Sequence, residues 1–335
     1  MLESFANFLQ NTGLYALISS GGIDAVKTII MIAIACVLLY LAIVKKFEPL
    51  LLLPIAFGML LSNLPMIKDS SAIMMHTEFF TNPEYMTDGK YINVGYICQH
   101  GGLLDLLYLG VKLGIYPPLI FVGIGCMTDF GPLIANPKSI LLGAAAPFGV
   151  FFTFVGALVL SALVPSINFG IKEAASIGII GGADGPTAIY VTKSLAPALL
   201  PAIAVAAYSY MALIPVIQPP IMKLMTRKKD RMIVMEQLRP VSKTEKILFP
   251  IIVTIIVALI IPDAVSLVGC LMLGNLMKES GVVERLTKMA QNELMNIITL
   301  FLGVTVGATA TASSFLSAQT IGIIVLGLIA FCVGT

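Results

Sequence analysis

Long apolar segments follow one another along most of this chain and limit its fold more than any other feature. A helix needs about 20 apolar residues to cross the hydrocarbon core of a bilayer. Two clear segments run from Lys27 to Val44 and from Pro49 to Leu64, and further ones cover 103–127, 139–165, 171–199, 201–222, 247–262, 264–277, 294–310 and 317–334. The pattern predicts an all-α, polytopic membrane protein.

The composition excludes several other classes of protein. Of the 335 residues, 58% are hydrophobic and 11% are charged, whereas soluble domains contain roughly 45–50% and about 25%. A soluble enzyme and a disordered chain are therefore excluded. The formal net charge of +2 is small and its carriers are scattered, which excludes binding to nucleic acid. With 2 histidines and no closely spaced cysteines, a His- or Cys-based metal site is not expected.

We expect a single integral membrane domain over 1–335, divided by its polar stretches. Apolar residues in 1–26 have the spacing of an amphipathic helix that lies at the membrane interface. The remaining divisions are two spans (27–64), an external loop (65–100), a broken-helix core (101–222), a basic cytoplasmic loop (223–246) and a second helical block (247–335). The side of the membrane on which each loop lies follows from the Lys and Arg residues of 223–246, because short basic loops stay in the cytoplasm. A dock for an acidic soluble partner is the alternative role of this loop.

Two segments are unusual for helices that face lipid. Each contains one aspartate, Asp129 or Asp184, followed closely by Gly-Pro. Proline removes a backbone donor and glycine loosens the helix, so we expect an unwound turn in each. Free carbonyl groups cost several kcal/mol each in hydrocarbon, so such a turn must lie inside protein or beside a water-filled cavity. The segments are Gly123–Pro132 and Gly178–Thr187.

Carbonyl oxygens and one carboxylate together make a site that suits a hard cation such as Na⁺. We expect Asp184, with the backbone of Gly182 and Gly185, to form this site, and Asp129 to belong to the site or its pathway. Half-helix N-termini nearby present positive dipole ends to an anionic substrate. The structural alternative pairs Asp184 with a lysine, Lys172 or Lys193.

Other polar groups in apolar segments have two possible roles. Tyr208 and Tyr210 are either hydrogen-bonding groups between helices or, at the Asp184 cavity, a proton donor or ion ligand. Asn275 is expected to stabilise helix packing. The small residues of Gly303–Gly307 predict close helix packing, although Thr305 and Thr309 could line a polar path.

Several motifs resemble those of the β subunits of sodium-pumping biotin-dependent decarboxylases. This family includes the β chains of oxaloacetate, methylmalonyl-CoA, glutaconyl-CoA and malonate decarboxylases. The resemblance extends from about residue 25 to the end of the chain and rests on residues 181–189, 128–137, 208–215, 218–220 and 292–294.

The resemblance implies a role, partners and a fold. A carboxyltransferase α subunit moves a carboxyl group onto biotin on a carrier protein, and the β subunit decarboxylates this carboxybiotin and moves Na⁺ outward across the bacterial cytoplasmic membrane. Asp184 matches the Na⁺-binding aspartate of the family, and Tyr210 matches a tyrosine implicated in ion or proton handling. The implied fold has inverted repeats, broken helices and an elevator-like mechanism, in trimers with a small γ/δ membrane subunit. No single residue is assigned to biotin.

The chain departs from the family pattern at its C-terminus. It ends at Thr335, directly after an apolar segment, where the family continues into a second broken region with conserved Asn, Ser and Arg residues. From the sequence, the inverted repeat is therefore expected to be incomplete. Another departure is Ala312–Phe315, where the family more often has an acid.

The first functional hypothesis is a Na⁺-translocating decarboxylase β subunit. A secondary Na⁺/carboxylate symporter needs the same broken helices but no biotin, and an inactive, truncated β subunit is the third alternative. The sequence leaves the decarboxylated acid open, because the carboxyltransferase selects it.

Overall fold

The computed structural model of the protein describes residues 12–19, 21–65, 75–80, 82–88, 91–143, 146–234 and 239–335. Within these residues the chain is almost entirely helical. The α-helices are α2 (Gly13–Ser19), α3 (Gly22–Ile43), α4 (Pro49–Asn63), α5 (Val94–His100), α6 (Leu103–Lys112), α7 (Tyr116–Met127), α8 (Gly131–Ala135), α9 (Ile140–Gly143), α10 (Ala146–Leu163), α11 (Ile171–Gly178), α12 (Gly185–Leu195), α13 (Leu200–Met225), α14 (Lys243–Ile260), α15 (Val265–Ser280), α16 (Glu284–Met289), α17 (Met295–Ala308), α18 (Ala312–Phe315) and α19 (Ala318–Gly334).

Short elements join these helices. The 3₁₀ turns are η1 (Thr77–Phe80), η2 (Pro83–Tyr85), η3 (Pro137–Ser139), η4 (Ile179–Gly182), η5 (Pro197–Leu199), η6 (Asp230–Met232) and η7 (Pro262–Ala264), and η8 (Ala290–Leu294) is a π-helical turn. Two-residue strands β1 (Met86–Thr87) and β2 (Tyr91–Ile92) pair antiparallel. The predicted all-α fold class is confirmed.

The predicted apolar segments correspond to helices, but several of them are divided. Among the described residues, α3 is long and apolar enough to cross a membrane alone, and α6 and α7 together pass the same test as a pair bent by 70°. The bend follows Gly114, whose φ of 74° is left-handed, and precedes Pro117 in the first turn of α7. Helix α3 begins at Gly22, earlier than the predicted Lys27. Part of the predicted interfacial segment 1–26 lies outside the described residues.

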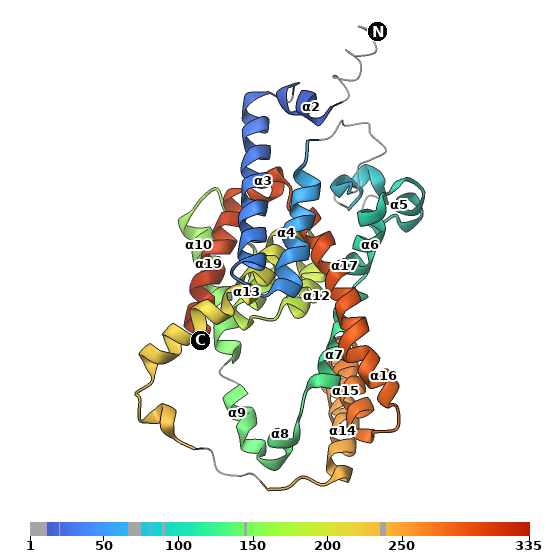
Figure 1. The fold of residues 1–335 in the computed structure, drawn as a ribbon, viewed down its shortest axis with the longest axis vertical. Helices are drawn as coiled ribbons and strands as arrows, with labels where there is room; N and C mark the ends of the chain where they lie inside the picture. Colours follow the sequence, from blue (N-terminus) through green and yellow to red (C-terminus); the bar gives the residue numbers. More distant parts are fainter. Residues whose placement is uncertain are drawn as a thin grey trace.

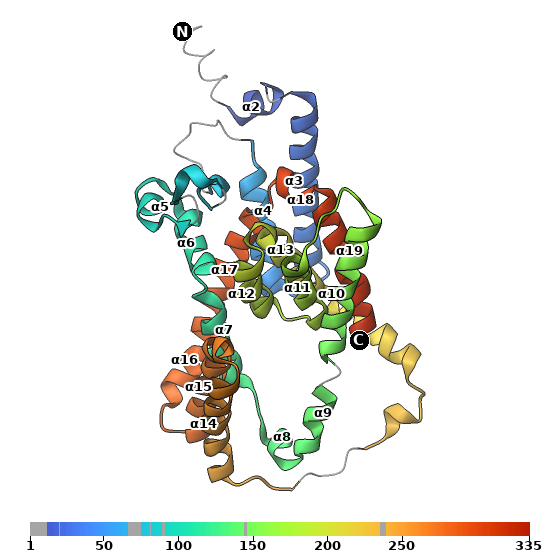
Figure 2. The ribbon, with the colours of Figure 1, turned by 180° about the vertical axis from the view of Figure 1, so that it is seen from behind.

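Among the described residues, most helices pack around two large hydrophobic cores, and a small cluster at Ala42 and Leu52 joins α3 to α4. In the first, α17 lies along α4, which also packs against α3. In the second, α10 packs against α11 and α19, and α13 packs against α12 and α19. Helices α7, α14 and α15 form a third group at the end of the molecule away from the N-terminus (Figures 1 and 2). A chain segment with α8 and α9 connects α7 to α10.

The predicted external loop is folded where the structure describes it. Its turns η1 and η2, the β1–β2 hairpin and α5 lie at the end of the molecule that also carries α2 (Figure 1). Phe79, Phe80 and Ile97 are buried in the first core and hold this cap in place. The basic loop between α13 and α14 extends toward the opposite end, which is consistent with the predicted sides of the membrane.

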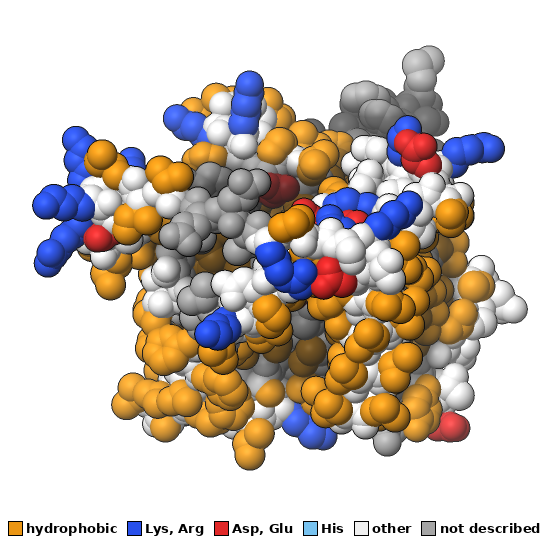
Figure 3. All heavy atoms as spheres, turned by 90° about the horizontal axis from the view of Figure 1, so that it is seen from below, with side chains coloured by type: hydrophobic (Ala, Val, Ile, Leu, Met, Phe, Trp, Pro, Cys, Tyr) orange, Lys and Arg blue, Asp and Glu red, His pale blue; other side chains and the backbone are white. Residues whose placement is uncertain are grey.

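The outer surface has the hydrophobic character expected of a membrane protein. Large apolar side chains are exposed on α3, α10, α14 and α19, among them Ile29, Phe151, Ile255 and Val325. Figure 3 shows broad hydrophobic areas on the face seen from below, with Lys and Arg gathered in separate groups. This surface needs an apolar surrounding or partner helices to cover it.

Glycines permit the closest helix crossings. A Cβ atom on Gly307 of α17 would overlap the Ile55 carbonyl of α4, and one on Gly303 would meet Pro54. The predicted packing face at Gly303–Gly307 is therefore confirmed. Thr305 and Thr309 are buried on this helix, and their hydroxyls donate to backbone carbonyls of α17.

A buried aspartate of α6 holds His76 of the external cap. Asp105 is fully buried, and its Oδ1 accepts a hydrogen bond from the His76 amide at 2.7 Å. Its Oδ2 lies 2.6 Å from His76 Nδ1 and accepts from the Gly102 amide at 2.9 Å. The sequence analysis missed this pair, although an acid at the start of the apolar segment 103–127, three residues after Gly102, was a usable signal.

Gly274 and Gly269, both on α15, give a matched test of helix packing. A Cβ on Gly274 would overlap the Val122 carbonyl of α7, whereas one on Gly269 would meet only side-chain methyl groups, the nearer at 3.8 Å. We expect Gly274→Ala to lower the free energy of unfolding by about 2 kcal/mol because backbone must shift. Gly269→Ala should be neutral or stabilising, since alanine favours helix. Thermal unfolding in detergent measures the stability of both variants. Equal stabilities would contradict the close contact between α7 and α15 at Gly274.

Removal of the Asp105 carboxylate should destabilise the cap. In Asp105→Ala, the donors on His76 and Gly102 lose their acceptor inside the protein, at a cost of about 3–5 kcal/mol. We expect a lower melting temperature and faster proteolysis within 75–100. Glu84→Ala, an exposed acid on the same cap, should have little effect. Wild-type protease resistance of Asp105→Ala would refute this role.

Candidate functional site

The predicted break at Asp184 is present. Helix α11 ends at Gly178 and passes into the 3₁₀ turn η4, and Ala183 then adopts a left-handed conformation with φ 53°. Asp184 is extended, with φ −116°, and α12 begins at the next residue. Proline is tolerated in the first turn of a helix because its missing N–H has no helical partner there. Gly185-Pro186 therefore restarts the helix at once.

The Asp184 side chain caps α12. Its Oδ1 accepts from the Thr187 amide at 3.2 Å, and its Oδ2 accepts from the Thr187 hydroxyl at 2.5 Å. A carboxylate has about four lone-pair positions, so capacity for a further ligand remains. Lys193 instead donates to the Leu113 carbonyl at 3.1 Å, and this contact removes one candidate for the structural pairing of Asp184.

Asp184 borders an apolar pocket of about 350 Å³ between the helix break and three other helices. Its walls come from α4, α7, the start of α12 and α17, and are formed by Leu51, Ile120, Phe121, Ile124, Ala183, Asp184, Pro186, Met295, Thr299 and Leu302. The lining side chains other than Asp184 and Thr299 are apolar, so they offer the carboxylate no hydrogen bonds.

The other predicted members of the site lie near Asp184 to different degrees. Gly182 ends η4 and is exposed, whereas Gly185 is buried at the first position of α12. Tyr210 lies on α13, which packs against α12. The Tyr208 and Tyr210 side chains are outside the part of the chain that the structure describes, so their predicted roles stay predictions.

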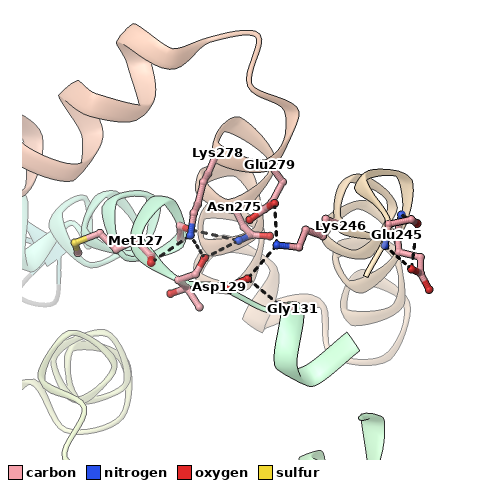
Figure 4. Close-up of polar contacts among 11 residues, drawn as sticks. Met127, Asp129, Gly131, Glu245, Lys246, Asn275, Lys278 and Glu279 are labelled. Carbon is pink, nitrogen blue, oxygen red and sulfur yellow. Dashed lines mark hydrogen bonds and ion pairs between the residues drawn. The ribbon is translucent and has the colours of Figure 1, made fainter. Parts of the chain in front are cut away.

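The structure places Asp129 in a different setting, at the second predicted break. Helix α7 ends at Met127, and α8 begins at Gly131. The Asp129 side chain is 57% exposed, and its Oδ1 accepts from the Gly131 amide at 2.9 Å and lies 3.4 Å from Lys246 Nζ on α14 (Figure 4). Lys246 also pairs with Glu279 at 3.6 Å. The Gly131 hydrogen bond and then Lys246 lower the pKa of the Asp129 carboxyl.

Backbone carbonyl groups at this end of α7 already accept hydrogen bonds from side chains. Asn275 and Lys278 of α15 each donate to the Thr128 carbonyl at 3.0 Å (Figure 4). Gln291 of η8 donates to the Cys126 carbonyl at 2.6 Å. Amide and ammonium donors suit a helix C-terminus because its dipole is negative there. The predicted packing role of Asn275 is confirmed.

The two breaks therefore differ in chemistry. Asp129 is paired with a lysine, whereas the Asp184 carboxylate belongs to the lining of an apolar pocket, and Thr187 is its hydrogen-bond partner among the described residues. The structure does not bring the two aspartates to one pocket, since the α7 residues beside Asp184 are Ile120, Phe121 and Ile124. The sequence analysis missed Lys246 and Lys278, which looked like surface charges and belong to elements distant in sequence from Asp129.

Comparison with known proteins gives a consistent result. The model of the family described as "Na+-transporting oxaloacetate decarboxylase beta subunit" matches residues 27–335. The methylmalonyl-CoA decarboxylase subunit beta of Propionigenium modestum is 56% identical over 335 residues, which cover 100% of this chain and 80% of the relative.

Two further relatives act on other acids, according to their names. The probable oxaloacetate decarboxylase beta chain of Vibrio cholerae is 49% identical, with 100% of this chain and 82% of the relative covered. The glutaconyl-CoA decarboxylase subunit beta of Acidaminococcus fermentans is 53% identical, with 91% and 72% covered. The chain thus belongs to the family of Na⁺-transporting oxaloacetate decarboxylase beta subunits, the membrane subunits of decarboxylase complexes.

Proposed function

We propose that this chain decarboxylates carboxybiotin on a carrier protein and couples this reaction to Na⁺ export across the bacterial cytoplasmic membrane. The observation that carries the proposal is the Asp184 carboxylate at a helix break beside an apolar pocket. Family membership supplies the reaction class. The acid that donates the carboxyl group is chosen by a carboxyltransferase α subunit, and a small γ/δ subunit completes the membrane part, which we expect to be a homotrimer.

Asp184 is the proposed Na⁺ ligand. Its carboxylate has lone pairs beyond those that Thr187 uses and belongs to the lining of an otherwise largely apolar pocket, where a bound cation would balance its charge. The exposed backbone at Gly182 and the start of α12 at Gly185 lie directly beside this carboxylate and are proposed to complete the site. Asp129, with its lysine partner, is proposed to lie on the pathway to the site rather than within it.

The chemistry requires loss of CO₂ and gain of a proton. When the C–N bond of carboxybiotin breaks, its electron pair stays on the ureido nitrogen, which then takes a proton. Removal of water around the carboxylate favours this cleavage, because the product CO₂ is uncharged. We propose that Tyr210, on the helix next to α12, relays the proton. Coupling requires that Na⁺ and carboxybiotin favour the same conformational state.

Substitution of Asp184 tests the site. In Asp184→Asn the charge is lost while the size is kept, so we expect Na⁺ uptake into inverted vesicles to fall at least about 100-fold for the complete complex. Asp263→Asn, an exposed aspartate in the turn before α15, is the matched control and should retain uptake. Unchanged uptake by Asp184→Asn would discard the site assignment.

Avidin distinguishes the decarboxylase from a Na⁺/carboxylate symporter. Because avidin sequesters biotin, it should abolish Na⁺ uptake driven by the decarboxylated acid in the complete complex. Uptake that persists at its full rate in avidin, and follows an external carboxylate gradient, would refute the proposed coupling and favour the symporter.

A further inference from the structure

The pocket beside Asp184 has a second polar side chain in its lining. Asp184 and Thr299 are the polar members of a lining that is otherwise apolar. Asp184 belongs to the break before α12, whereas Thr299 belongs to α17. The volume of about 350 Å³ accommodates a small cation with several waters, since one water occupies about 30 Å³ in the liquid.

The Thr299 hydroxyl differs from those of several other helical threonines. The hydroxyls of Thr128, Thr153, Thr254 and Thr305 each donate to the carbonyl four residues earlier, at 2.6–2.7 Å. Within the described part of the chain, no hydrogen bond joins the half-buried Thr299 hydroxyl to another group. A polar group in an apolar lining carries a free-energy cost unless a ligand or water satisfies it.

Helix α17 holds this hydroxyl in a fixed place. Gly303, one turn after Thr299, packs against Pro54, and Gly307 packs against the Ile55 backbone, so α17 lies tightly on α4. The neighbouring Ile298 and Leu302 are buried in the first hydrophobic core. The pocket is thus bounded by a broken helix on the Asp184 side and by a firmly packed helix on the Thr299 side.

We infer that the Thr299 hydroxyl is a second oxygen ligand for the Na⁺ bound at Asp184. The inference rests on the proposed function, because it deepens the same site. Small hard cations need several oxygen ligands, and a hydroxyl and a carboxylate in the lining of one pocket supply two of them where the other lining side chains are apolar. The contact joins the helix break to α17, so the ion stabilises the arrangement in which these two elements face one another.

The test compares Thr299→Val and Thr299→Ser in the complete complex. Valine keeps the shape and removes the hydroxyl, so the Na⁺ concentration for half-maximal uptake into inverted vesicles should rise about tenfold, the scale of one lost contact to a charged group. Serine keeps the hydroxyl and should stay within about twofold of wild type. Thr299→Ala, measured in parallel, also removes the hydroxyl but introduces no branched side chain. If Thr299→Val fails to assemble, Thr299→Ala still tests the loss of the hydroxyl.

Thr305→Val is the matched control on the same helix. The Thr305 hydroxyl donates to the Phe301 carbonyl, and Thr305 is not among the residues that line the pocket. It should leave the half-maximal Na⁺ concentration unchanged. A wild-type value in both Thr299→Val and Thr299→Ala would overturn the inference, as would an equal shift in Thr305→Val. Failure of the proposed function is distinguishable, because wild-type activity would then be independent of Na⁺ or insensitive to Asp184→Asn.

Discussion

Backbone groups at helix breaks must find partners inside an apolar protein, and this requirement organises the structure. Each break frees amide or carbonyl groups that hydrocarbon cannot hydrogen-bond. The chain meets this requirement locally at Asp184, whose carboxylate caps the new helix through Thr187. At the end of α7 it does so through tertiary contacts from Asn275, Lys278 and Gln291.

The two breaks differ in whether their oxygen atoms remain available to a ligand. A carbonyl that already accepts from an ammonium or amide group is a poor ligand for a cation, and a carboxylate beside a lysine has its charge balanced. The Asp129 region is therefore suited to hold α7, α14 and α15 together. Asp184, with spare lone pairs and apolar neighbours, is the aspartate to which we assign the proposed Na⁺ site.

Tight helix packing provides the fixed surroundings for such a site. The glycine contacts between α4 and α17 and between α7 and α15 leave little freedom for these pairs to separate. The Asp184 pocket lies where α4, α7 and α17 meet the start of α12, so movement of the broken segment against the packed helices would open or close it. Coupling between ion binding and decarboxylation requires a site of this kind, whose shape depends on the relative position of two elements.

The sequence by itself determined the fold class, the apolar segments and the position of both breaks. These features are local, because hydropathy, Gly-Pro pairs and small-residue spacing act within one segment, as at Asp184 and Gly303–Gly307. Only the tertiary structure decided which charged side chains pair with one another. The Asp129–Lys246 and His76–Asp105 pairs join residues far apart in sequence, and Thr299 lines the same pocket as Asp184 only because α17 packs beside the helix break. Local patterns fix where a helix ends, but contacts between distant segments depend on how the helices pack.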